Sequence, residues 1–134
     1  MTTMTTPSAP ALSEIVICST CRPPGNGREA PAAGAQLLDA AQQLQSLDDT
    51  GRYTQLRVRE VQCMSSCSQA CTAAIQAPGK PTYLFGGLAP DIETAAQLLD
   101  CARLHQTQAD GTLARNERPE RLRQGILARI PAAG

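Results

Sequence analysis

The sequence predicts one α/β domain in which helices pack against a four-stranded mixed sheet. Two observations indicate this fold class. Short apolar segments with the length of strands alternate with two longer segments whose apolar residues recur at helical spacing. The first three elements form a strand–helix–strand unit, whose strands should run parallel with a right-handed crossover, and the last three begin with an antiparallel hairpin. The expected order is therefore β-α-β-β-β-α.

The strand–helix–strand unit begins at residues 13–19, where three consecutive β-branched residues are typical of a short buried strand. A second strand is expected at residues 56–61, which alternate between apolar and polar side chains. The helix between them is predicted over residues 32–47 from its apolar stripe. That stripe consists of Leu37, Leu38, Ala41, Leu44 and Leu47.

The second half of the domain begins with a hairpin. Residues 72–77 and 81–85 have strand character and flank Pro78-Gly79-Lys80, which favours a turn. A helix then opens at Pro90-Asp91, because proline suits the first turn and aspartate caps it. Its expected apolar stripe is Ile92, Ala95, Ala96, Leu99 and Ala102.

We expect the domain to span residues 13–108, between two less ordered ends. Residues 1–12 are rich in Thr, Ser and Pro and are predicted to form a disordered leader. Residues 109–134 are predicted to form a loop and a short basic helix from Glu117, with Leu122, Ile126 and Ile130 at intervals of four. This tail carries five Arg and could dock an acidic partner, but we favour a helix laid on the body with its Arg solvated.

The composition excludes several classes of protein. No apolar run reaches the roughly 18 residues of a membrane span, and no signal peptide is recognisable, so we expect a cytoplasmic protein without membrane association. A net charge of zero and three aromatic residues argue against nucleic-acid binding. Leu, Ile, Val and Phe make up only 24 of the 134 residues, so the core is light and the six Cys require an explanation.

Two pairs of cysteines follow the two strands of the strand–helix–strand unit. Cys18 and Cys21 come after the first strand, and Cys63 and Cys67 come after the second. Because parallel strands end at the same edge of a sheet, we expect the pairs to converge there. Four thiolates are the full ligand set of a tetrahedral Zn site or of an iron–sulfur cluster.

Other roles for these cysteines are less favoured. A single Cys is most often a small core residue, but five within residues 18–71, in loops of Ser, Thr and Gln, indicate more. A thioredoxin-type redox dithiol needs a helix at the second Cys, whereas Arg22-Pro23-Pro24 follows Cys21. The choice between Zn and a cluster stays open on ligand number. The surrounding residues weakly favour a cluster, because their hydroxyl groups could donate hydrogen bonds to its sulfur atoms. These hydroxyls belong to Ser19, Thr20, Ser65 and Ser66.

The cysteine pattern resembles that of the thioredoxin-like 2Fe-2S ferredoxins. The segments VQCMSSC (residues 61–67) and YLFGGL (residues 83–88) match that class. The chain also resembles a family of short bacterial predicted metal-binding proteins of unknown function, often linked to cobalamin or metal handling. That resemblance rests on CSTCR, on CMSSCSQACTAAIQAPGKPTYLFG and on ERPERLRQGILARIP, and it runs from about residue 17 to residue 131.

The resemblance implies a thioredoxin-like fold and a 2Fe-2S cluster. It assigns Cys63 and Cys67 to the C-x-x-x-C ligand motif and Cys18 and Cys21 to the first pair. These ferredoxins usually separate the first two cysteines by four residues or more, so Cys71 is a reserve ligand. The implied function is one-electron transfer to an unidentified redox partner protein, without a catalytic site, and a homodimer is allowed. The alternative is a Zn-binding structural module or a metal-delivery protein.

Three further residues receive structural interpretations. Cys101 lies off the apolar stripe of the last helix and is interpreted as structural. His105 is expected at the end of that helix, partly exposed and without a ligand role. Lys80, the only Lys, is expected in a solvated turn.

Overall fold

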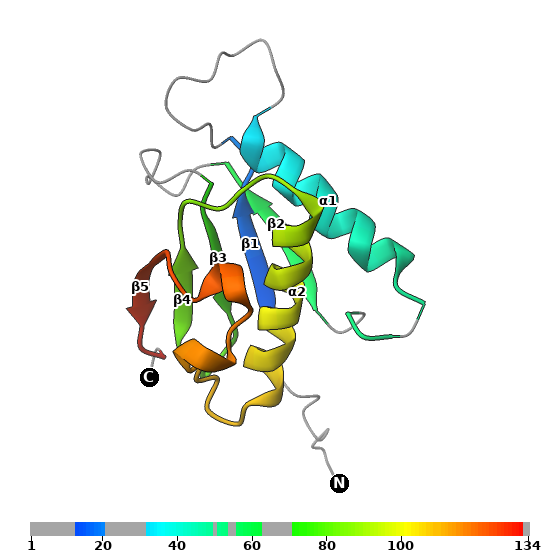
Figure 1. The fold of residues 1–134 in the computed structure, drawn as a ribbon. Helices are drawn as coiled ribbons and strands as arrows, with labels where there is room; N and C mark the ends of the chain where they lie inside the picture. The colour runs from blue at the N-terminus through cyan, green and yellow to red at the C-terminus, as the bar shows by residue number, and fades with distance from the viewer. Residues whose placement is uncertain (1–12, 21–31, 50, 54–55, 63–70, 133–134) are drawn as a thin grey trace, which may run out of the picture.

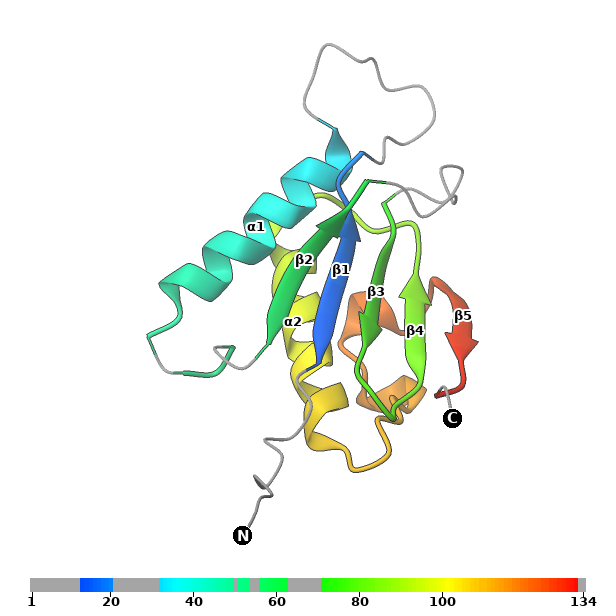
Figure 2. The same ribbon diagram turned by 180° about the vertical axis from the view of Figure 1, so that it is seen from behind.

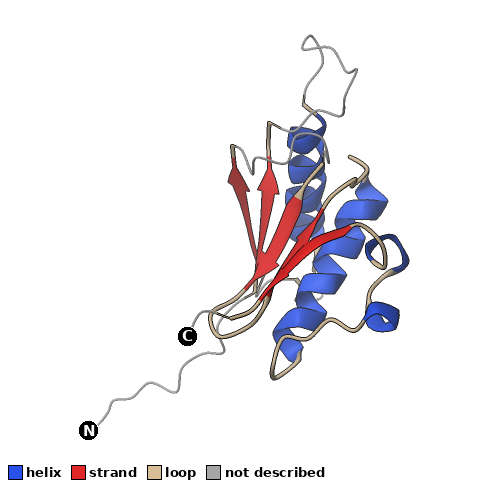
Figure 3. Ribbon diagram, turned by 90° about the vertical axis from the view of Figure 1, so that its left-hand side faces the viewer, coloured by secondary structure: helices blue, strands red, loops and turns tan. Residues whose placement is uncertain are grey.

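Two helices cover one face of a five-stranded sheet, and no element of the described chain covers the opposite face (Figures 1, 2 and 3). The structure is a computed structural model that describes residues 13–20, 32–49, 51–53, 56–62 and 71–132. The elements in chain order are β1 (Glu14–Cys18), α1 (Ala33–Leu47), β2 (Arg57–Val61), β3 (Ala73–Gln76), β4 (Thr82–Phe85), α2 (Ile92–Thr107), the 3-10 turns η2 (Arg115–Glu117) and η3 (Glu120–Leu122), and β5 (Ile126–Ile130).

The predicted strand–helix–strand unit is confirmed. β1 and β2 are parallel neighbours, with Ile15 opposite Val58 and Cys18 opposite Val61. α1 crosses between them on the covered face of the sheet (Figure 1). Ile15 and Ile17 are buried beneath the helices, and Val16, whose side chain points to the other face, is also buried in this central strand.

The predicted hairpin is also confirmed. β3 and β4 are antiparallel, and β3 lies on the other side of β1 with Ile15 opposite Ile75. The turn closes with a hydrogen bond from Lys80 N to Ala77 O (3.1 Å), and Gly79 adopts a φ of +76° there. Glycine suits this position because side chains disfavour a positive φ.

The prediction of four strands and of a C-terminal helix is wrong. Residues 126–130 form β5, which pairs with β4 and becomes the fifth strand of the sheet order β2-β1-β3-β4-β5. The spacing that suggested a helix also fits the two-residue period of a strand. Gly125, at a φ of +85°, redirects the chain so that its carbonyl accepts from Gly86 N (2.8 Å). Pairing with β4 satisfies backbone groups that an exposed strand edge would otherwise leave to water.

The arginines of the tail are not simply solvated, as the sequence suggested. Arg121 forms ion pairs with Asp91 (3.3 Å) and Glu93 (2.6 Å) at the start of α2. Arg129 donates from Nε to the Tyr83 hydroxyl (3.1 Å), and Arg118 is buried. These contacts fasten the segment after α2 to the rest of the domain.

The core lies between the sheet and its two helices. α2 faces it with a stripe that is rotated from the predicted one: Ile92 is 51% exposed, whereas Leu98 and Cys101 are buried. Asp91 caps this helix as predicted, because its side chain accepts from Thr94 N (2.8 Å). Within the part of the chain that the structure describes, no helix has both the length and the apolar content to cross a membrane.

Leu122 tests whether the segment after α2 belongs to the folded core. Its side chain is fully buried against α2 from η3, whereas Leu127 in β5 is 38% exposed. We expect Leu122→Ala to lower the free energy of unfolding in urea by about 2 to 5 kcal/mol, because it leaves a cavity. Leu127→Ala should cost less than about 1 kcal/mol. Equal, small effects of the two changes would show that the segment contributes nothing to the core.

Candidate metal centre

The ends of β1 and β2 meet at one edge of the sheet, as the sequence predicted. Cys18, the last residue of β1, lies opposite Val61, the last residue of β2. Beyond the strands the contact continues, because Ser19 N donates to Val61 O (2.9 Å) and the Thr20 hydroxyl donates to Gln62 O. The chain immediately before Cys63 is therefore fastened to the chain immediately after Cys18.

The thiol of Cys18 faces this junction. The side chain is buried, and its Sγ lies 3.7 Å from Gln62 O and 3.7 Å from the Thr20 hydroxyl oxygen. Thr20 was expected to donate to cluster sulfurs; its hydroxyl lies beside the Cys18 sulfur but donates to Gln62 O, just after β2. The Cys18 sulfur thus lies between two strand ends, near a carbonyl oxygen and a hydroxyl oxygen.

Cys71 reaches the same edge from a third strand. It precedes β3 and exchanges two backbone hydrogen bonds with Leu88 (3.3 and 3.0 Å). The carbonyl of the next residue, Thr72 O, accepts from Cys18 N (3.1 Å), so Cys71 directly precedes the residue opposite Cys18. Cys71 is completely buried within the main apolar cluster. Cys71 therefore lies at the same edge of the sheet as Cys18, at a core position.

The other predicted ligands fall where the structure gives no description. Cys21, Cys63 and Cys67 lie outside the described residues. Among the residues that are described, no three His, Cys, Asp or Glu side chains come together in a way that could hold a metal ion. The predicted ligand set therefore remains a prediction, and what the structure adds is the position of Cys18 beside the residue that precedes Cys63.

Cys101 has the environment of a structural residue. It is completely buried on α2, and burial raises the pKa of its thiol to about 12. A thiol with that pKa stays protonated at neutral pH, whereas a metal ligand must be a thiolate. The environment agrees with the interpretation drawn from the sequence.

His105 is not partly exposed, as the sequence suggested, but completely buried. One ring nitrogen is hydrogen-bonded to the Ser13 hydroxyl (2.8 Å) and the other to Pro81 O (2.8 Å). Burial lowers its pKa, and the nearby charge of Lys80 contributes to the same direction. With both nitrogens engaged, His105 has no free position for a metal.

Lys80 is also not in a solvated turn. Its ammonium group donates to His105 O (2.9 Å) and Gln106 O (2.7 Å), the last carbonyls of α2. A cation is favourable at a helix C-terminus, where carbonyls have no partner within the helix. Lys80 therefore links the β3–β4 turn to α2.

Sequence reasoning did not single out a group of charged residues at the other end of the sheet. Glu14 at the start of β1 forms an ion pair with Arg59 of β2 (2.6 Å), next to Arg57 and Gln76. The available signal was Arg57-Val58-Arg59, which places two cations on one face of a strand. When the neighbouring strands are not known, this pattern cannot be distinguished from that of any solvent-exposed edge strand.

Comparison with known proteins gives a family and a fold. A family described as "Protein of unknown function (DUF1636)" matches residues 15–132. No curated protein matches the sequence. Two solved structures of a thioredoxin-like 2Fe-2S ferredoxin from Aquifex aeolicus are similar in fold. One has a TM-score of 0.54 at 12% identity over 88% of this chain and 92% of that chain. The other has a TM-score of 0.55 at 16% identity over 87% and 97%. The predicted thioredoxin-like fold is thereby confirmed.

The buried imidazole of His105 predicts a loss of stability on acidification. Because its pKa is lower in the folded chain than the usual 6.5, the unfolded chain binds a proton first as the pH falls. The contribution of His105 to the free energy of unfolding is therefore fully present above about pH 6.5. Below that pH it declines, by at most about 1.4 kcal/mol per pH unit. We expect urea unfolding between pH 7.5 and 5 to show this decline, and His105→Asn to flatten it. An equally steep decline in the variant would assign the effect to other groups.

Proposed function

The chain belongs to the DUF1636 family of proteins of unknown function, and we propose that it is an iron–sulfur electron-transfer protein. In this proposal Cys18, Cys21, Cys63 and Cys67 hold a 2Fe-2S cluster, with Cys71 as the reserve ligand. Its function is to carry one electron to or from a redox partner protein, and it has no catalytic site of its own.

One observation carries the proposal: the parallel pairing that sets Cys18 opposite Val61. The next residues along β2 are Gln62, whose carbonyl lies 3.7 Å from the Cys18 sulfur, and Cys63. The residue before the second cysteine motif therefore lies beside Cys18, although the two motifs are 42 residues apart in the chain. The similarity to a ferredoxin of the same fold supports a cluster at this edge.

The residues around Cys18 hold its sulfur in one position. The strand ends are fastened to each other by hydrogen bonds from Ser19 and Thr20, which fixes the position of the Cys18 sulfur before any metal is bound. The Thr20 hydroxyl oxygen lies 3.7 Å from that sulfur, and it would have to turn away from Gln62 O to donate to a thiolate there. When bound, a 2Fe-2S cluster supplies one-electron redox chemistry. The part of the chain described here supplies a sulfur atom whose position is held by the two strand ends.

A Zn site is the second candidate, and one observation favours it. Cys18 and Cys21 have the C-x-x-C spacing that is common in structural Zn sites, and this spacing departs from the wider one of the ferredoxins. Four thiolates satisfy Zn as well as a cluster. In this alternative the protein is a structural module or delivers a metal ion.

Metal analysis separates the two candidates. We expect protein purified without oxygen to be red-brown, to contain two iron and two sulfide per chain, and to give a paramagnetic signal after one-electron reduction. These properties follow from a 2Fe-2S cluster and are not possible for Zn. Colourless protein with one Zn per chain, prepared in the same way, would overturn the electron-transfer proposal.

Single cysteine variants test the ligand set. We expect Cys21→Ser to lose most of the iron and sulfide, because oxygen replaces a thiolate ligand, and Cys71→Ser to retain them. Cys101→Ala is the matched control: it removes a buried thiol from α2, away from the strand ends, and should leave the iron content unchanged. Retention by Cys21→Ser together with loss by Cys71→Ser would make Cys71 the fourth ligand.

A further inference from the structure

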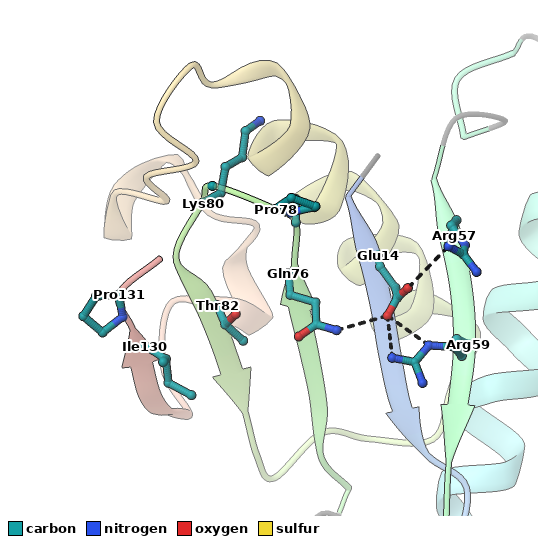
Figure 4. Close-up of a pocket in the computed structure, with 11 residues that line it drawn as sticks. Glu14, Arg57, Arg59, Gln76, Pro78, Lys80, Thr82, Ile130 and Pro131 are labelled. Carbon is teal, nitrogen blue, oxygen red and sulfur yellow. Dashed lines mark hydrogen bonds and ion pairs between the residues drawn. The ribbon is translucent and has the colours of Figure 1, made fainter. Parts of the chain in front are cut away.

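A depression of about 680 Å³ lies on the uncovered face of the sheet, at the end opposite Cys18. It begins at Glu14, the first residue of β1, whereas Cys18 is the last. Side chains from all five strands line it, and the principal ones are Glu14, Arg57, Arg59, Gln76, Thr82 and Ile130. Figure 4 shows the charged groups on one side and Ile130 with Pro131 on the other.

Glu14 holds the floor of the charged side in place. Its Oε1 accepts from Arg59 Nη2 (2.6 Å) and Nε (3.0 Å), and from Gln76 Nε2 (3.1 Å). The hydrogen bond from Arg59 lowers the pKa of this carboxyl group, so it is ionised at neutral pH. The charge of Arg59 is therefore already paired with that of Glu14.

Arg57 is the cation that the depression leaves available. Its Nη1 lies 4.0 Å from Glu14 Oε2, which is longer than a hydrogen bond, and its side chain is 64% exposed. Lys80 also borders the depression, but its ammonium group is bound to carbonyls of α2. Among the described residues that line the depression, the guanidinium of Arg57 is thus the cationic group that a ligand can engage.

The opposite side of the depression is apolar. Ile130 is 51% exposed on β5, and Pro131 lies beside it (Figure 4). Four strand spacings separate the backbones of β2 and β5, about 19 Å in a flat sheet. Gln76 and Thr82 occupy the space between them (Figure 4).

We propose that this depression binds an amphipathic monocarboxylate. Its carboxylate would pair with Arg57, and its hydrocarbon chain would lie across the sheet towards Ile130. The geometry of a guanidinium matches both carboxylate and phosphate. Glu14 stands beside Arg57, however, and its charge disfavours a ligand that carries two negative charges. The local charge of two arginines and one carboxylate is therefore suited to a ligand with a single negative charge. The site is independent of any metal at the cysteines.

Binding of decanoate, measured by NMR titration of the ¹⁵N-labelled protein, tests the proposal. We expect saturable shifts at Arg57, Gln76, Thr82 and Ile130, with weaker binding of the uncharged decanamide and of acetate. Arg57→Gln should weaken decanoate at least about tenfold, since a charge-assisted hydrogen bond is lost. Ile130→Ser should weaken it about two- to tenfold. The control Arg103→Gln removes an exposed arginine from α2 and should change nothing.

Three outcomes would overturn the proposal. Equal affinities for decanamide and decanoate would show that the site does not recognise the negative charge of the ligand. Tighter binding of inorganic phosphate than of decanoate would show that the ligand is not a monocarboxylate. Unchanged affinity in Arg57→Gln, when its melting curve matches that of the parent protein, would place the ligand elsewhere. Because Arg57 and Ile130 are both exposed, both variants should fold.

Discussion

The parallel pairing of β1 with β2 constrains the rest of the molecule. A parallel neighbour requires a long crossover, and α1 supplies it on one face of the sheet. The other side of β1 then pairs with β3, which makes β1 central and accounts for its buried Ile15 and Ile17. The same pairing brings the ends of two strands to one edge. The position of Cys18 and the burial of the core thus have a common cause.

Buried polar groups connect the hairpin to the last helix. The His105 ring is hydrogen-bonded to Ser13, before β1, and to the carbonyl of Pro81 in the β3–β4 turn. Lys80 donates hydrogen bonds to carbonyls in the last turn of α2. In a domain with few large apolar residues, such contacts favour a single docking of α2, because a different docking would leave these polar groups unpaired in the interior. Tyr83 has a similar role for the segment after α2, since its hydroxyl bonds Leu113 N and Arg129 Nε.

The chemistry of the protein is divided between the two ends of β1. At one end Cys18 lies among the strand ends, where we propose a metal centre. At the other end Glu14 organises two arginines on the uncovered face of the sheet, where we propose an anionic ligand. The two regions share one strand and one face, since Glu14 and Cys18 are four residues apart and side chains alternate along a strand. A ligand at one end would therefore border the surface that leads to the other.

The order of the first six elements followed from sequence alone, because apolar periodicity and turn residues report which side chains a segment can bury. The convergence of Cys18 with the chain before Cys63 followed too, because a crossover connection forces parallel strands. Tertiary structure alone decided that residues 126–130 form a strand, since the open edge of β4 competes with the local preference for a helix. It also decided the burial of His105 and the contacts of Lys80 and Glu14. These depend on residues from distant elements, and no local pattern records which of them will meet.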